Sequence, residues 1–108
     1  MSAEDPLTRD APMVRISDET VIEGMGGLTW QLRAHLATGA RFVVADVSAV
    51  RWLSSTAVAA LLGAHRVCRS RGGSVVVRNA SRRTLDVLNR SGLDEVFQIE
   101  TPTDPPDR

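Results

Sequence analysis

Two short runs of aliphatic and β-branched residues constrain the fold of this chain more strongly than any other feature. They are R-F-V-V-A-D-V at Arg41–Val47 and S-V-V-V-R at Ser74–Arg78. Runs that are apolar without alternation are typical of strands that are covered on both faces of a sheet. The segment between them is long enough for the helical crossover that parallel neighbours require. The pair therefore predicts a strand, helix, strand unit at the centre of an α/β domain.

The flanking segments extend this alternation. Apolar residues at helical spacing predict a helix that ends at Gly39, from Met25 onward, and another that begins after the N-cap Ser81 and ends at Gly92. Short extended pieces are expected at 13–16, 20–23 and 96–100. We expect the early pieces to add antiparallel pairs. The predicted fold class is α/β, with a mixed sheet of about four or five strands and helices packed against it.

The ends of the chain predict one domain with two flexible tails. Residues 1–12 and 102–108 are polar and carry all five prolines, whereas residues 13–101 contain the apolar periodicity. The N-terminus lacks the apolar region of a secretory signal, and no apolar run approaches the ~20 residues that span a bilayer. We expect a cytoplasmic protein that does not insert into a membrane.

Charge and motifs argue against nucleic acids and nucleotides as ligands. The 13 basic residues, all arginine, balance 13 acidic residues. A basic face formed by Arg82 and Arg83, with Arg78 and Arg90 nearby, is most simply a solvated helix face. The four aromatic residues are too sparse for a base-stacking platform. No glycine-rich nucleotide-binding loop is present, so we expect no cofactor.

The residues that commonly carry catalysis are few and isolated. His35 has no acidic or cysteine neighbour at a metal-ligand spacing, so no metal site is predicted. His65 lies three turns along a helix from Ser54, which is too far for a nucleophile and base pair. Cys68 is the only cysteine and lies near the end of that helix, so it lacks the helix N-terminal setting that lowers the pKa of a thiol. We therefore expect no catalytic residue and no enzyme.

Three adjacent hydroxyl residues, Ser54, Ser55 and Thr56, precede a run with helical spacing that closes at Gly72. Ser and Thr accept hydrogen bonds from the unpaired N–H groups of a first turn, so Ser54 or Ser55 serves as an N-cap. Val58 is then expected as the first core residue. Exposed hydroxyls at a helix start can also receive a phosphate, and the two roles are compatible.

The chain resembles the STAS domain of bacterial anti-sigma factor antagonists. The resemblance rests on V-V-A-D-V-S-A-V-R-W-L-S-S-T-A-V-A-A-L-L, followed by R-G-G-S-V-V-V and S-G-L-D-E-V-F. The family signature Asp-Ser-[Ser/Thr]-Gly falls on Ser54, Ser55, Thr56 and Ala57, with Ser in place of Asp and Ala in place of Gly. The resemblance implies that these four residues bind a partner and that Thr56, or as second choice Ser55, is phosphorylated.

The implied partner is an anti-sigma factor with an ATPase and kinase fold. It would bind the unmodified domain and end the contact by phosphorylating it. The alternative is a STAS subunit of a transporter or stress-signalling complex that uses the same surface without phosphorylation. The expected oligomeric state is a monomer or a weak homodimer.

Overall fold

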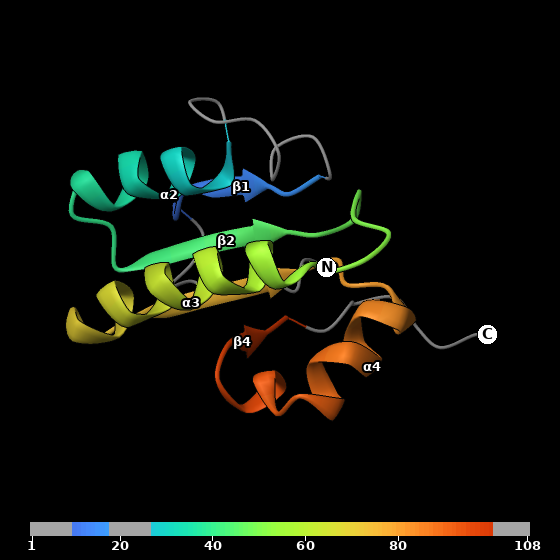
Figure 1. Cartoon of the computed structure of the whole chain (residues 1–108). Helices are drawn as coiled ribbons and strands as arrows, with labels where there is room; N and C mark the ends of the chain where they lie inside the picture. The colour runs from blue at the N-terminus through green and yellow to red at the C-terminus, as the bar shows by residue number, and fades with distance from the viewer. Residues whose placement is uncertain (1–9, 18–26, 101–108) are drawn as a thin grey trace.

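The computed structural model describes residues 10–17 and 27–100, in which helices pack against a four-stranded sheet (Figure 1). The strands are β1 (Met13–Arg15), β2 (Phe42–Asp46), β3 (Ser74–Arg78) and β4 (Gln98–Ile99). The helices are α2 (Leu28–Ala37), α3 (Ser55–Ser70), α4 (Arg82–Arg90) and the 3-10 turn η2 (Leu93–Glu95). This arrangement confirms the predicted α/β fold class.

The sheet has the strand order β1-β2-β3-β4, and each neighbouring pair is parallel. In the central pair, Val43 lies opposite Val75 and Ala45 lies opposite Val77. Every pairing within residues 10–17 and 27–100 is parallel because a helix returns the chain to the same edge before each new strand begins. The antiparallel pairs that we expected are not found there, and the extended piece expected at 20–23 lies outside the described residues.

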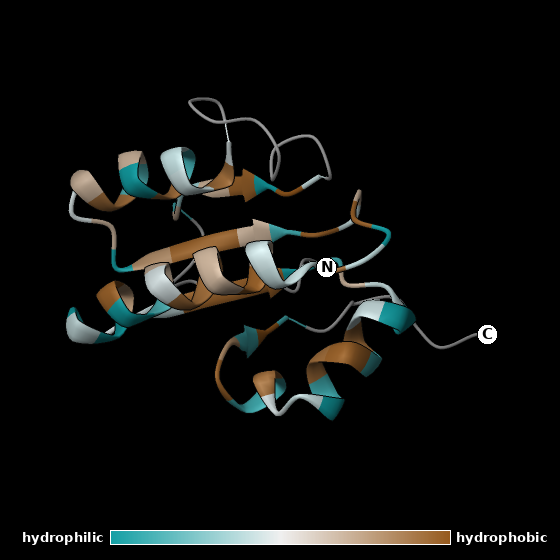
Figure 2. Cartoon of the chain, in the orientation of Figure 1, coloured by the Kyte–Doolittle hydropathy of each residue, from teal (hydrophilic) through white to brown (hydrophobic). Residues whose placement is uncertain are grey.

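The two central strands are buried on both faces, as the apolar runs predict. Val43 and Ala45 of β2 belong to the main core together with Val75 and Val77 of β3. Between them, Val44 and Val76 are also buried but lie outside that core cluster, because neighbouring side chains along a strand point to opposite faces. Figure 2 shows β2 and β3 mainly in brown, the colour of hydrophobic residues, beside helices that carry both hydrophobic and hydrophilic residues.

Helix α3 covers the sheet with a face of small and aliphatic residues. Its buried positions are Ala57, Leu61, Ala64, His65 and Cys68, and it packs beside α2 (Figure 1). The first buried residue is therefore Ala57, whereas we expected Val58, which is only half-buried. Both positions fit a 3.6-residue period, and the rotation of the helix against the sheet decides between them.

The helix ends follow the predicted signals. Gly39 and Gly92 follow α2 and α4 with φ values of 90° and 77°, which glycine adopts without strain. Ser81 is the N-cap of α4, and its hydroxyl accepts a hydrogen bond from the Thr84 N–H at 3.1 Å. The last strand is shorter than the predicted 96–100, because η2 and a bond from the Phe97 N–H to the Leu93 carbonyl keep the preceding residues in a turn.

Within residues 10–17 and 27–100, no helix has the length and apolar character needed to cross a membrane.

Candidate functional site

The start of helix α3 carries the hydroxyl residues singled out by the sequence. Ser54 is the N-cap, with extended backbone angles, and its Oγ accepts a hydrogen bond from the Ala57 N–H at 3.1 Å. The Ser54 carbonyl accepts the first helical bond, from the Val58 N–H at 3.0 Å. The predicted cap role is thus filled by Ser54, which leaves Ser55 and Thr56 on the first turn without a capping task.

Ser55 and Thr56 lie exposed on that turn. In the part of the chain that the structure describes, neither hydroxyl makes a side-chain hydrogen bond, and the first turn of α3 contains no acidic residue. The N–H groups of a helix start carry a partial positive charge, which here has no carboxylate from the turn to balance it. We call Ser54, Ser55 and Thr56 the hydroxyl surface.

Ala57 does not belong to this surface. The resemblance implies that Ala57 binds a partner, but its side chain is only 1% exposed and packs in the core. A helix residue that follows Thr56 by one position lies about 100° further round the axis, which here points it at the sheet. Of the four residues that the resemblance implies, only the three hydroxyl residues are therefore exposed, and the Ala57 methyl group does not obstruct the outer surface.

Thr56 also lines an apolar groove between α2 and α3. The groove has a volume of about 640 Å³, and α2 contributes Leu32, Arg33 and Leu36 to its walls. Small residues of α3 form the other wall: Thr56, Ala59, Ala60, Gly63 and Ala64. A partner that reaches Thr56 therefore finds apolar surface beside the hydroxyl.

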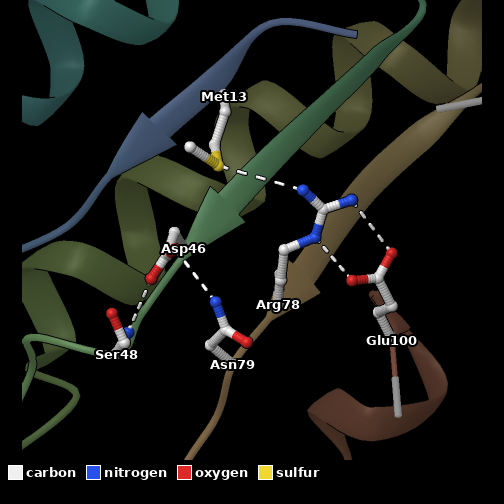
Figure 3. Close-up of polar contacts among 6 residues, drawn as sticks. All are labelled: Met13, Asp46, Ser48, Arg78, Asn79 and Glu100. Atoms are coloured by element: carbon white, nitrogen blue, oxygen red, sulfur yellow. Dashed lines mark hydrogen bonds and ion pairs between the residues drawn. The ribbon is translucent and has the colours of Figure 1, made fainter. Parts of the chain in front are cut away.

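A polar network at the carboxyl edge of the sheet holds the loop that leads to α3 (Figure 3). One Asp46 oxygen accepts a hydrogen bond from the Ser48 N–H at 2.9 Å, and the other accepts one from the Asn79 side chain at 3.0 Å. These bonds join the loop after β2 to the turn after β3. Asn79 has a φ of 62°, a left-handed conformation that asparagine tolerates better than most residues.

The charge of Asp46 is retained despite its burial. Burial raises the pKa of a carboxyl, but the hydrogen bonds from Ser48 and Asn79 and the positive charge of Arg15 outweigh it. The pKa of Asp46 therefore lies below its ordinary value. The ionised Asp46 carboxylate thus links the loop after β2 to the turn after β3.

Arg78 is occupied within the fold and is not part of a basic face. Its guanidinium makes two parallel bonds to Glu100, one from Nε to Oε1 and one from Nη2 to Oε2 at 3.1 Å, and Nη1 lies 3.9 Å from the Met13 sulfur (Figure 3). This ion pair ties β3 to the residue after β4. The arginines of α4 must therefore be considered without Arg78.

His65 and Cys68 are buried inside the fold. The Val75 N–H donates to His65 Nδ1 at 3.2 Å, and the imidazole packs edge-on against Phe97 with the ring centres 5.5 Å apart. Burial lowers the pKa of His65, and the nearby charge of Arg69 lowers it further. Cys68 is fully buried, which raises the pKa of its thiol. Across residues 10–17 and 27–100, no group of three or more His, Cys, Asp or Glu residues is placed to hold a metal ion.

Sequence reasoning missed a contact between Trp52 and helix α4. Trp52 lies two residues before the hydroxyl surface and is 64% exposed, and the Arg83 guanidinium lies 4.5 Å from the centre of its ring. The two residues line a pocket of about 360 Å³ together with Arg82, Asp86, Val87 and Arg90. The spacing of the arginines on α4 was visible in the sequence, but nothing indicated that Trp52 packs beside them.

Comparison with known protein families matches almost the whole chain to one of them. The pattern of the family described as "Mlab, STAS domain" matches residues 4–100, which include all the described strands and helices. No curated protein matches the chain in sequence. STAS domains are in general non-enzymatic modules that mediate protein–protein interaction, and an anti-sigma factor antagonist is one regulatory type. The chain belongs to the Mlab, STAS domain family.

Proposed function

We propose that this protein is a cytoplasmic anti-sigma factor antagonist that docks on its partner through the hydroxyl surface and is released when Thr56 is phosphorylated. The partner is an anti-sigma factor with an ATPase and kinase fold, which the antagonist removes from a sigma factor. The single observation that carries the proposal is the exposure of Ser55 and Thr56 at a helix start whose cap is supplied by Ser54.

The setting of Thr56 suits a phosphate without harm to the fold. A phosphate adds about −1.5 to −2 charge at neutral pH, and the N-terminus of a helix attracts negative charge. Because the first turn of α3 has no acidic residue, that charge meets no carboxylate on the same turn. The scaffold therefore tolerates the modification that disrupts the docking surface.

The effect on binding is much larger than the effect on folding. A partner surface that fits the unmodified domain would have to desolvate the added charge or would repel it. If this makes the binding free energy less favourable by about 3 kcal/mol, binding weakens more than 100-fold. The phosphate also adds bulk at the mouth of the groove between α2 and α3, which Thr56 lines. One hydroxyl thus suffices to end the complex.

Thr56 is the preferred acceptor over Ser55 for two reasons. The family signature places the acceptor at the position of Thr56, and Thr56 is the member of the pair that lines the apolar groove. A phosphate on Thr56 therefore alters both the hydroxyl surface and the groove. Ser55 remains the second choice.

The test is phosphate transfer from purified candidate anti-sigma kinases. Each kinase is incubated with the protein and ATP, and intact mass is measured for a gain of one phosphate. We expect transfer to the natural protein and to the Ser55→Ala variant, and no transfer to Thr56→Ala. A Thr56→Glu variant should fold normally and bind the same kinase more than about 100-fold more weakly. Tight binding of Thr56→Glu would refute the switch.

The replacement of the family Asp by Ser54 favours a second candidate. A kinase that reads the acidic residue would bind this chain without modifying it, as expected for a STAS subunit of a transporter or stress-signalling complex. In that case the same experiment yields a stable complex with no gain of mass under any condition. If the kinase requires the missing acidic residue, the Ser54→Asp variant should gain one phosphate under conditions in which the natural protein gains none.

A further inference from the structure

Trp52 and the arginines of α4 form a second exposed surface beside the hydroxyl residues. Trp52 extends from the loop that links β2 to α3, and the pocket of about 360 Å³ lies between its ring and one face of α4. That face carries Arg82, Arg83 and Arg90 around the aliphatic Val87. We call Trp52 and these three arginines the Trp–arginine surface.

The fold fixes the ring in this exposed position. Val50, two residues earlier, is buried and donates its N–H to the Val47 carbonyl at 3.2 Å, and Leu53, one residue later, packs against the core. The loop is therefore anchored on both sides of Trp52. An indole that is anchored in this way and still 64% exposed places a large apolar group in water, which is common for residues that anchor protein interfaces.

The charges around the ring favour an acidic ligand. The three arginines are exposed, whereas Asp86 is the only acidic residue that lines the pocket. Guanidinium groups pair with carboxylates through two parallel hydrogen bonds, and the Arg83 guanidinium is already held against the ring. The surface thus combines an apolar centre with cationic groups that are ready to bind carboxylates.

We propose that the Trp–arginine surface binds an acidic segment of a protein partner, whose carboxylates face Arg82, Arg83 and Arg90 and whose apolar residues cover Trp52. This inference rests on the proposed function in one respect: the segment belongs to the same partner that docks on the hydroxyl surface. Both helices begin at the edge where β2 and β3 end, so one partner is able to span the two surfaces (Figure 1).

A protein segment fits these observations better than a nucleic acid or a membrane. The pocket offers one aromatic ring, whereas single strands are bound by successive stacked bases. The chain as a whole has no net charge that would attract a polyanion.

An acidic partner also explains why a phosphate on Thr56 would end the contact. Carboxylates bound beside Trp52 would lie near the hydroxyl surface, which begins only two residues later in the chain. Negative charge added there repels the segment that the arginines attract. The same partner chemistry therefore accounts for both attraction and release.

The test follows Trp52 fluorescence in the 108-residue chain carrying Trp30→Phe, so that Trp52 is the only tryptophan. The probes are the candidate anti-sigma kinases, a synthetic helical peptide with Glu and Leu at helical spacing, the same peptide with Lys for Glu, and vesicles of phosphatidylcholine and phosphatidylglycerol. We expect a blue shift with a bound kinase and with the Glu peptide, and none with the Lys peptide or the vesicles.

Two variants test the residues. The Trp52→Ala variant lacks the fluorescent ring, so its binding is measured through a label on the probe. This substitution should weaken binding by about 30-fold or more, as expected for an anchor residue of an interface. The pair Arg82→Glu and Arg90→Glu should weaken it at least about tenfold and reduce its salt dependence. The helix dipole favours the first substitution and disfavours the second, and each places a glutamate four residues from Asp86, so the folding of the pair is checked by far-UV circular dichroism. Arg66→Glu, at an exposed position far along α3, is the matched control and should leave binding unchanged.

The outcomes separate this inference from the proposed function. A kinase that binds and phosphorylates the protein, yet ignores Trp52→Ala and the arginine pair, would overturn the inference and leave the switch intact. Binding of the Glu peptide at Trp52, with no kinase bound, would support an acidic segment as the ligand of the Trp–arginine surface and refute the proposed function. Equal binding of both peptides, binding of neither, or binding of the vesicles in preference to the Glu peptide would overturn the proposal of an acidic protein segment.

Discussion

Removal of the Ser54 hydroxyl should weaken the start of α3 by a predictable amount. In Ser54→Ala, the Ala57 N–H loses the acceptor that it now has at 3.1 Å. Loss of a Ser cap costs about 0.5–2 kcal/mol. The upper part of this range applies here because Ala57 is buried and water reaches its N–H poorly. We expect the free energy of unfolding to fall by about 1.5 kcal/mol, and the melting temperature by roughly 6–12 °C.

Urea unfolding followed by far-UV circular dichroism measures this change, with Ser55→Ala as the matched control. Ser55 is exposed one residue further on and caps nothing, so its substitution should change stability by less than about 0.5 kcal/mol. Ser54→Asp keeps an acceptor for the Ala57 N–H and adds a charge that the helix dipole favours by about 0.3–1 kcal/mol. This variant should be at least as stable as the natural protein. If Ser54→Ala were no less stable than Ser55→Ala, the cap described above would not hold the helix start.

Three further predictions concern the stability and packing of the fold. Gly73→Ala places a Cβ only 1.8 Å from the Arg41 carbonyl oxygen and should cost about 3 kcal/mol or more in urea unfolding, whereas Gly63→Ala meets nothing within 4 Å and should stabilise α3 by about 1 kcal/mol. Burial lowers the pKa of His65 below its ordinary value of about 6.5, so the unfolded chain binds the proton more readily than the folded protein. The contribution of His65 to the free energy of unfolding should therefore be fully present above about pH 6.5 and should be lost as the pH falls below it. Urea titrations at a series of pH values measure this change. Cys68 is fully buried and should react with a thiol reagent only at the rate of unfolding, so rapid labelling of the folded protein would contradict its placement.

The sequence predicted the central fold because its signals there are local and agree with one another. The two β-branched runs became β2 and β3, and Ser54 and Ser81 became the caps of the helices that follow. The parallel pairing of β2 and β3 follows from the crossover between them, whereas β1, for which we expected an antiparallel partner, is parallel to β2. Each of these predictions depends on residues within one element, so a single sequence was sufficient.

The features that could not be predicted depend on contacts between distant elements. Whether Ala57 or Val58 points inward is decided by how α3 rolls against the sheet, since both satisfy helical spacing. Trp52 and Arg83 are separated by a whole crossover and meet only because two loops leave the same edge of the sheet. The Asp46 and Asn79 contact arises in the same way.

Because the N-cap Ser54 is uncharged, a phosphate on Thr56 should affect helix stability and partner docking in opposite directions. In the family signature an acidic residue occupies the position of Ser54, so the helix start would already carry a negative charge before modification. Here Ser54 supplies the hydrogen bond without that charge, and no residue of the first turn is acidic. A phosphate on Thr56 would therefore be the first negative charge on this turn, stabilising the helix through its dipole while repelling an acidic partner from the Trp–arginine surface. One added charge thus acts in opposite directions on folding and on docking, which allows the contact to be broken while the scaffold persists.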